Sequence, residues 1–140
     1  MYTMKETCDQ VNITYETLRF YCNEGLVPNV RRDKNNYRIF DERNINWLKS
    51  LQCLRKCGMS IRDMKLYMRL CLQGAYSIPE RKRMLDAQKC ALLEKMREIS
   101  ACIDFIDGKQ KYFDGVLEGT IQYASNLVPP GEEQAPHKVI

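Results

Sequence analysis

The feature that most constrains the fold is an apolar residue at every seventh position in the second half of the chain. These residues are Leu85, Leu92, Ile99, Ile106 and Phe113. Met96 and Ile103 occupy partner positions three or four residues away, whereas Lys89 and Gln110 interrupt that second line. Such a long, narrow stripe indicates a coiled-coil helix, predicted from about 79 to 116. Since the chain offers no internal partner for this helix, we expect a homodimer.

Helix-capping residues mark two short helices at the N-terminus. Thr3 and Glu6 have the spacing of a capping box, and Asn12 suits a tight left-handed turn. Thr14 can cap the second helix, and Gly25 can end it. Two short helices joined by such a turn predict a helix-turn-helix, whose second helix reads DNA. The alternative is an ordinary packed helix with solvated polar residues.

A polar, turn-prone segment follows at 29–40. We predict two short strands and a loop there, a β-wing, with arginines and a lysine available to phosphates: Arg31, Arg32, Lys34 and Arg38. Residues 1–75 hold 13 Lys/Arg against 8 Asp/Glu, a net charge of +5, which favours a polyanionic partner. The alternative is a solvated basic loop.

Three more helix starts follow the wing. Asp41 can cap a third helix that runs to about 57, with Leu48, Leu51 and Leu54 as its apolar stripe. Ser60 can cap a fourth helix that continues through residue 72. Ser77 and Glu80 have capping-box spacing and predict the start of the long helix.

With these elements in place, the chain closely resembles the MerR family of bacterial transcription regulators over residues 2–118. The resemblance rests on motifs listed here as they stand in the chain: Tyr2-Thr3, Thr17-Leu18-Arg19-Phe20-Tyr21, Glu24-Gly25-Leu26-Val27-Pro28, Asn36-Tyr37-Arg38-Ile39-Phe40, Leu54-Arg55 and Gly58-Met59-Ser60-Ile61. Three positions depart from the family pattern. Asn36 replaces the usual wing Gly, Cys22 stands where an acidic residue is usual, and Asn12 where Gly is common. Asn can adopt the geometry of both turns.

The resemblance implies an all-α fold with a small β-wing: a winged helix-turn-helix followed by a long helix that dimerises as an antiparallel coiled coil. We expect a DNA-binding domain at 1–75, the dimerisation helix at 76–118 and a flexible tail at 119–140. Dimers of this family bind double-stranded promoter DNA with an overlong spacer. They distort it when an effector arrives, and so act on RNA polymerase indirectly through the shared promoter.

The residue patterns and the resemblance together predict which residues bind DNA and which dimerise. The predicted DNA contacts are Thr14, Tyr15, Thr17, Arg19, Tyr21, Arg31, Arg32, Tyr37, Arg38, Lys56, Ser60 and Arg62. Tyr15 and Arg19 are the candidates for base edges, and the amides behind Ser60 suit a phosphate. The predicted dimerisation residues are Leu85, Leu92, Met96, Ile99, Ile103, Ile106 and Phe113.

Composition excludes several other classes. No stretch approaches the length of apolar sequence that a membrane span needs, so we expect a cytoplasmic protein that contacts no membrane. Seven cysteines without a C-x-x-C pair, and one histidine in the tail, do not predict a disulfide framework or a zinc finger. We predict no catalytic residue, cofactor or metal. A thiol-dependent enzyme would lack a histidine base, and a coiled-coil adaptor would leave the basic wing unexplained.

Cys53 is the candidate sensor. On an ideal helix it points almost opposite the leucine stripe, and Lys49 and Lys56 share its face. Nearby cations favour the reactive thiolate. The surrounding residues also resemble the branch of the family that responds to aldehydes and other electrophiles through one cysteine. Cys57 is the candidate resolving thiol. The alternative is a Cys53 that packs inertly against the partner's long helix.

Two other effector classes remain open at this point. Residues 108–119, where metal-sensing members of the family carry a pair of cysteines, contain no cysteine, although a thiolate site across the dimer is conceivable. A small hydrophobic ligand is the other alternative. Its pocket would be lined by Met64, Tyr67, Met68, Tyr76 and Phe113.

Overall fold

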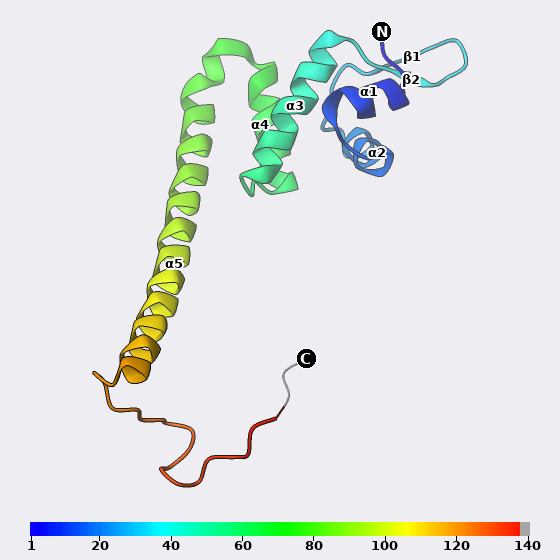
Figure 1. The fold of residues 1–140 in the computed structure, drawn as a ribbon. Coiled ribbons are helices and arrows are strands. Elements are labelled where there is room, and N and C mark those ends of the chain that lie inside the picture. Colours follow the sequence, from blue (N-terminus) through cyan, green and yellow to red (C-terminus); the bar gives the residue numbers. More distant parts are fainter. Residues whose placement is uncertain (138–140) are drawn as a thin grey trace. The chain divides into compact units, whose positions relative to one another are not determined.

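A computed structural model describes residues 1–137 of the chain, and its contacts divide the protein into two compact units. The first unit is Met1–Leu93 and the second begins at Glu94. The prediction of a mostly helical protein with a small wing and a long C-terminal helix is confirmed (Figure 1). This division falls inside the long helix, and the predicted domain boundaries at residues 75 and 118 stay predictions. Of the predicted tail, residues 138–140 lie outside the described part.

The first two helices begin and end where the capping residues predict. Helix α1 (Met4–Val11) starts with a complete Thr3–Glu6 capping box and ends at Asn12, which is left-handed with φ of 58°. Helix α2 (Tyr15–Asn23) starts at Thr14, whose hydroxyl accepts a hydrogen bond from the Thr17 amide. Gly25 then takes φ of 72°, as expected for the end of a helix. The helix-turn-helix is thus set by local chemistry.

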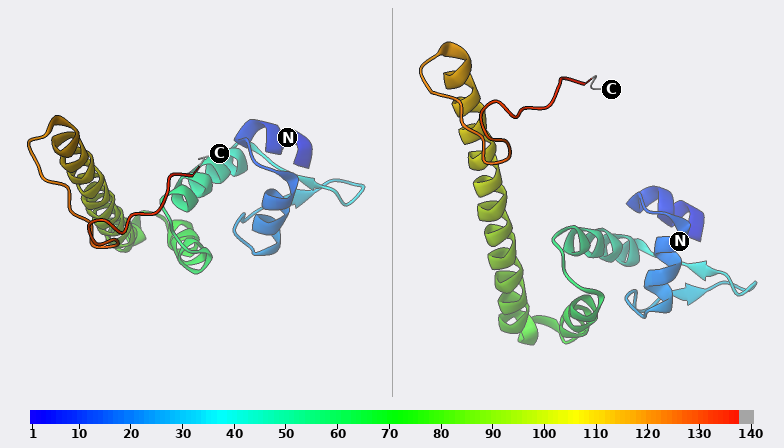
Figure 2. Two further views of the ribbon diagram at one scale, coloured as in Figure 1. Left: turned by 60° about the horizontal axis from the view of Figure 1, so that its bottom comes forward. Right: turned by 90° about the horizontal axis from the view of Figure 1, so that it is seen from below.

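The wing is a two-stranded antiparallel sheet of β1 (Arg31–Arg32) and β2 (Arg38–Ile39). The Asp33 carboxylate closes the loop between the strands by accepting from the Asn35 and Tyr37 amides. Asn36 adopts φ of 67°, so it does supply the turn geometry usually given by Gly. The two views in Figure 2 show the strands side by side, with their connecting loop extending away from the helices.

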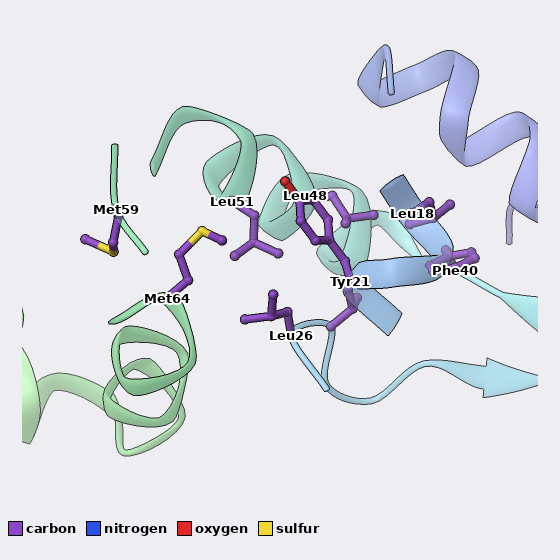
Figure 3. Close-up of a cluster of buried hydrophobic side chains, with 9 residues drawn as sticks. Leu18, Tyr21, Leu26, Phe40, Leu48, Leu51, Met59 and Met64 are labelled. Carbon is purple, nitrogen blue, oxygen red and sulfur yellow. The ribbon is translucent and has the colours of Figure 1, made fainter. Parts of the chain in front are cut away.

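Helices α3 (Glu42–Lys56) and α4 (Ile61–Leu72) complete the core of the first unit. Asp41 and Asn44 form the capping box of α3, and the Ser60 hydroxyl caps α4. The core lies between α2, α3 and α4 (Figure 3). Its fully buried members include Leu18, Tyr21, Leu26, Phe40, Leu48, Leu51 and Met64. The predicted leucine stripe of α3 is confirmed, with Leu54 partly buried beside it.

Polar contacts tie the end of α2 to the two helices behind it. The Trp47 indole N–H of α3 donates to the Leu26 carbonyl at 2.7 Å. The Lys65 ammonium of α4 contacts the Glu24 carboxylate at 2.6 Å. Because these bonds come from two different helices, they fix the position of the C-terminal end of α2 relative to α3 and α4.

The connection to the long helix differs from the predicted capping box. Between α4 and α5 (Ile78–Glu118) lies a short 3-10 helix, η1 (Gly74–Ser77). Ser77 is buried, and its hydroxyl donates to the carbonyls of Leu70 and Gly74 while accepting from Arg81 Nε. Arg81 also reaches the Gly74 carbonyl. The hydroxyl therefore bonds to one carbonyl of α4 and one of η1 rather than to an amide of α5.

In the second unit, the chain turns back onto the last turns of α5. Gly119 takes φ of 82°, and the amides of Thr120 and Ile121 donate to the Gly115 carbonyl. The Tyr112 hydroxyl donates to the Ala124 carbonyl and accepts from the Ala124 amide. Residues 119–124 therefore form a hook on the helix end, whereas flexibility of the tail stays a prediction.

Candidate nucleic-acid interface and sensor cysteine

Helix α2 presents two large side chains to solvent. Tyr15 is 57% exposed and Arg19 is also exposed, so both candidates for base contacts are free to enter a groove. Thr14 and Thr17 share a hydrogen bond between their hydroxyls at 2.9 Å. The first turn of α2 is therefore rigid where it would approach DNA.

Tyr21 must be removed from the predicted DNA contacts. Its side chain has no exposed surface, because it packs between α2 and α3 in the core. The hydroxyl donates to Gln52 Oε1 at 2.9 Å and accepts from Arg55 Nη1 at 3.2 Å. The side chain thus positions residues of α3 instead of reaching a phosphate.

A basic hollow of about 470 Å³ lies at the N-terminus of α2. It is lined by Asn12, Ile13, Thr14, Thr17, Gln52, Arg55 and Lys56. Helix N-termini favour anions, and two cations on α3 add to this potential. Lys56 was predicted to bind DNA and Arg55 was not. The adjacent pair of basic residues at the end of α3 was the signal in the sequence for both.

The wing carries further exposed candidates. Arg31, Arg32 and Tyr37 are exposed, and Tyr37 is the most exposed of the three aromatic candidates at 70%. Arg38 Nη2 donates to Asn23 Oδ1 at 2.9 Å, so this partly buried arginine joins the wing to the end of α2. The bond makes wing and recognition helix one surface.

The start of α4 forms a separate candidate phosphate site. The Ser60 hydroxyl accepts from the Asp63 amide at 3.1 Å, and Ser60 and Arg62 are both exposed. Asp63 in the same first turn places a negative charge beside the amides. Phosphate binding at this helix end stays a prediction.

Cys53 is exposed on α3 and lines a pocket of about 350 Å³. The other lining residues are Lys49, Ser50, Leu54 and Tyr67. Tyr67 stacks on Trp47 with their ring centroids 6.4 Å apart and their planes 7° from parallel. The pocket therefore has one fixed aromatic wall.

All seven cysteines are free thiols, and their surroundings differ. Burial raises the pKa of the Cys22 thiol, although the nearby charges of Arg38 and Arg32 oppose this shift. Burial also raises the pKa of Cys8. Cys57 is half-buried at the end of α3, where its carbonyl accepts from Gln88 Nε2 at 2.8 Å. Within residues 1–137, no three His, Cys, Asp or Glu side chains gather where they could hold a metal ion.

The residues suggested for a hydrophobic ligand pocket are in contrasting environments. Met64 and Met68 are buried, and Met64 belongs to the core, whereas Tyr76 is 90% exposed. Tyr67 lines the Cys53 pocket. Met68 lines a smaller pocket with Trp47 and Cys71, and a shared ligand pocket stays a prediction.

Most of the predicted dimerisation residues are exposed in the single chain. This holds for Leu85, Met96, Ile99, Ile103, Ile106 and Phe113, while Leu92 is partly buried. Among residues 1–137, no helix combines the length and the apolar character needed to cross a bilayer. The long helix fits a role in dimerisation.

Comparison with known proteins decides the family. The model of the MerR HTH family of regulatory proteins matches residues 2–71, from the first β-bridge to the end of α4. The chain belongs to the MerR family. Its relatives include an uncharacterised HTH-type transcriptional regulator of Haemophilus influenzae, 33% identical over 112 residues that make up 80% of this chain and 83% of the relative.

Two further similar proteins are also transcriptional regulators. The HTH-type transcriptional regulator AdhR of Bacillus subtilis is 35% identical over 89 residues, 64% of each chain. The crystal structure of HiNmlR, a MerR family regulator that lacks the sensor domain, was solved bound to promoter DNA. It aligns with a TM-score of 0.68 and 32% identity, covering 84% of this chain and 89% of that one. The predicted class, a DNA-binding transcriptional regulator, is confirmed.

Proposed function

We propose that this MerR-family regulator acts as a homodimer on promoters with an overlong spacer, and that modification of Cys53 by aldehydes or other electrophiles changes how it distorts the DNA. The observation that carries the sensing proposal is the exposed Cys53 thiol in a pocket of the DNA-binding unit. RNA polymerase would respond indirectly, to the altered promoter. The cytoplasm would be the site of action.

The DNA-binding step uses two kinds of contact. Tyr15 and Arg19 would read base edges from α2, since both are exposed and lie on a helix fixed by bonds from α3 and α4. Arg31, Arg32 and Tyr37 of the wing would hold the phosphate backbone. Such contacts set the register of one protomer on one half-site.

Dimerisation would cover the apolar stripe of α5. Met96, Ile99, Ile103 and Ile106 are each more than half exposed in the second unit. Burying one such side chain contributes about 1.5–3 kcal/mol, so a second copy gains most by covering the whole stripe. A dimer presents two recognition helices, which suits a pseudo-palindromic operator.

Cys53 is well placed to couple chemistry to DNA geometry. It lies on α3, the helix that also bears Arg55 and Lys56 of the basic hollow. An adduct in the pocket has to share space with Leu54 and Tyr67, and Leu54 packs against the core. The adduct would therefore press on the helix that supports α2.

The experiment is transcription from a promoter that the protein binds with sequence selectivity in a gel shift. Formaldehyde or methylglyoxal is added to wild type, Cys53→Ser and Cys57→Ser. We expect both variants to bind the promoter, and the Cys53→Ser variant alone to lose induction. Full induction of Cys53→Ser would overturn the sensing proposal, and a lack of selective binding by wild type would overturn the promoter model.

A further inference from the structure

The Cys53 pocket contains two nucleophiles rather than one. Lys49 and Cys53 are four residues apart on α3, and both line the pocket. Side chains at this spacing are neighbours on a helix surface, with their Cβ atoms roughly 5–6 Å apart. The flexible four-carbon stem of lysine can bring its amine to the thiol.

The structure distinguishes Lys49 from the other lysine on this face of α3. Lys56 lines the basic hollow beside α2 and does not line the Cys53 pocket. Within residues 1–137, Lys49 takes part in no salt bridge. Its amine is therefore the one available to a small molecule that has reacted with Cys53.

We propose that a small aldehyde, formaldehyde first, is captured as a covalent bridge between Cys53 Sγ and Lys49 Nζ. The inference rests on the proposed function, because it assumes that Cys53 reacts with electrophiles. It adds a second reacting residue and a substrate class. Alkylating agents and oxidants modify the thiol but cannot supply the carbon that joins both side chains.

The chemistry needs no reagent beyond the aldehyde. The Cys53 sulfur bonds to the carbonyl carbon, the carbon–oxygen π bond breaks, and the thiol proton ends on the oxygen as a hydroxymethyl adduct. The neutral Lys49 amine then bonds to the same carbon, and the carbon–oxygen bond breaks. The hydroxyl group leaves as water with one amine proton, and no atom is oxidised or reduced.

The pocket walls suit a one-carbon bridge. The Tyr67 ring is held by its stacking on Trp47, and Leu54 packs against the core, so both limit the room beside Cys53. Ser50 is the third polar residue of the lining. A bridge between residues four apart would staple one turn of α3, a change that a simple thiol adduct does not make.

Mass spectrometry of the full-length protein after exposure to formaldehyde and dialysis tests the bridge. We expect wild type to retain a gain of one carbon atom per protomer, mapped by fragmentation to the 49–53 turn. Trypsin should no longer cleave after Lys49. Lys49→Arg keeps the positive charge but removes the primary amine, so this variant should hold only the hydroxymethyl adduct and lose it on dialysis. Lys56→Arg should retain the bridge.

The outcomes separate this inference from the proposed function. A hydroxymethyl adduct on Cys53 without loss of water, or a bridge to another lysine, would overturn the inference and leave Cys53 as the sensor. Wild type without any adduct at Cys53 even before dialysis would overturn both, because a reversible hydroxymethyl adduct is still present at that stage. Induction gives a second readout: Lys49→Arg should lose its response to formaldehyde and keep its response to a thiol-alkylating maleimide.

Discussion

The guanidinium of Arg55 lies 5.9 Å from the centroid of the Tyr21 ring and donates a hydrogen bond to the Tyr21 hydroxyl. The same hydroxyl donates to Gln52. A buried tyrosine of the recognition helix thereby sets the direction of an arginine that lines the basic hollow. Side-chain positions on α3 thus depend on a residue that never reaches the surface.

Tyr21→Phe should therefore cost both stability and DNA affinity. Loss of the hydroxyl leaves Gln52 and Arg55 without this partner, and we expect the free energy of unfolding to fall by about 1 kcal/mol in urea titration. Tyr15→Phe is the matched control, because the Tyr15 side chain is exposed on the same helix. An equal loss of stability in the two variants would contradict a role for the buried network.

Arg19 and Arg31 should differ in what their loss does to DNA binding. Arg19→Ala should lower the free energy of binding to the operator by about 1–3 kcal/mol and relax sequence selectivity, as expected for a contact to a base edge. Arg31→Ala should weaken binding to all sequences alike and lower the slope of log affinity against log salt by about 1. Fluorescence anisotropy on operator and scrambled DNA across a salt series measures both. If Arg31→Ala relaxed selectivity and Arg19→Ala lowered the salt dependence, Arg31 would be the base contact and Arg19 the phosphate contact.

Ile103→Glu should separate the dimer. The substitution places a charge in the middle of the exposed apolar stripe of α5, where a partner helix would have to bury it. Ala101→Glu adds the same charge on the opposite face of an ideal helix and should leave the dimer intact. Analytical ultracentrifugation gives the masses. Dimers in both variants would show that this stripe is not the interface.

Gly115→Ala should release the C-terminal hook. An added Cβ would overlap Ile121 Cδ1 and lie 2.8 Å from Cγ1, so the isoleucine has to move away. The helix itself should gain up to about 1 kcal/mol, because Ala favours helix over Gly. Hydrogen exchange should therefore speed up at 120–124 and not within α5. Unchanged exchange at 120–124 would mean that the Ile121 side chain moves aside while the hook stays bound to the end of α5.

Cys22 should make the stability of the fold depend on alkaline pH. Burial holds the folded pKa of this thiol above its ordinary value of 9.0, so the folded state retains the proton to higher pH than the unfolded chain. This contribution is fully present below pH 9.0 and is lost as the pH rises through the folded pKa. Urea unfolding of wild type and Cys22→Ser from neutral to alkaline pH should show wild type losing more stability.

The helices and turns were readable from the sequence because local chemistry determines them. Thr3, Asn12, Thr14 and Asp41 act within a few residues of themselves, so their spacing is enough to place the helix ends. The wing loop is fixed in the same way by the carboxylate of Asp33.

Long-range packing was where sequence reasoning stopped. Tyr21 lies in a motif whose matching positions contact DNA in the family that the sequence resembles. Its burial depends on where α3 packs, which the motif does not show. Ser77 had capping-box spacing, yet its hydroxyl donates to the carbonyls of Leu70 in α4 and Gly74 in η1. One wall of the Cys53 pocket is Tyr67 of α4, and the spacing of residues along α3 could not predict it.

The bond from Gln88 to the Cys57 carbonyl has a practical consequence for dissecting the protein. The last carbonyls of a helix have no partner within it, and here one of them is satisfied by a side chain far along the chain. A fragment cut at residue 75 would keep the whole family motif but lose this cap, and α3 would fray beside Cys53 and Lys56. The smallest portable DNA-binding module of this regulator therefore has to carry the opening turns of α5.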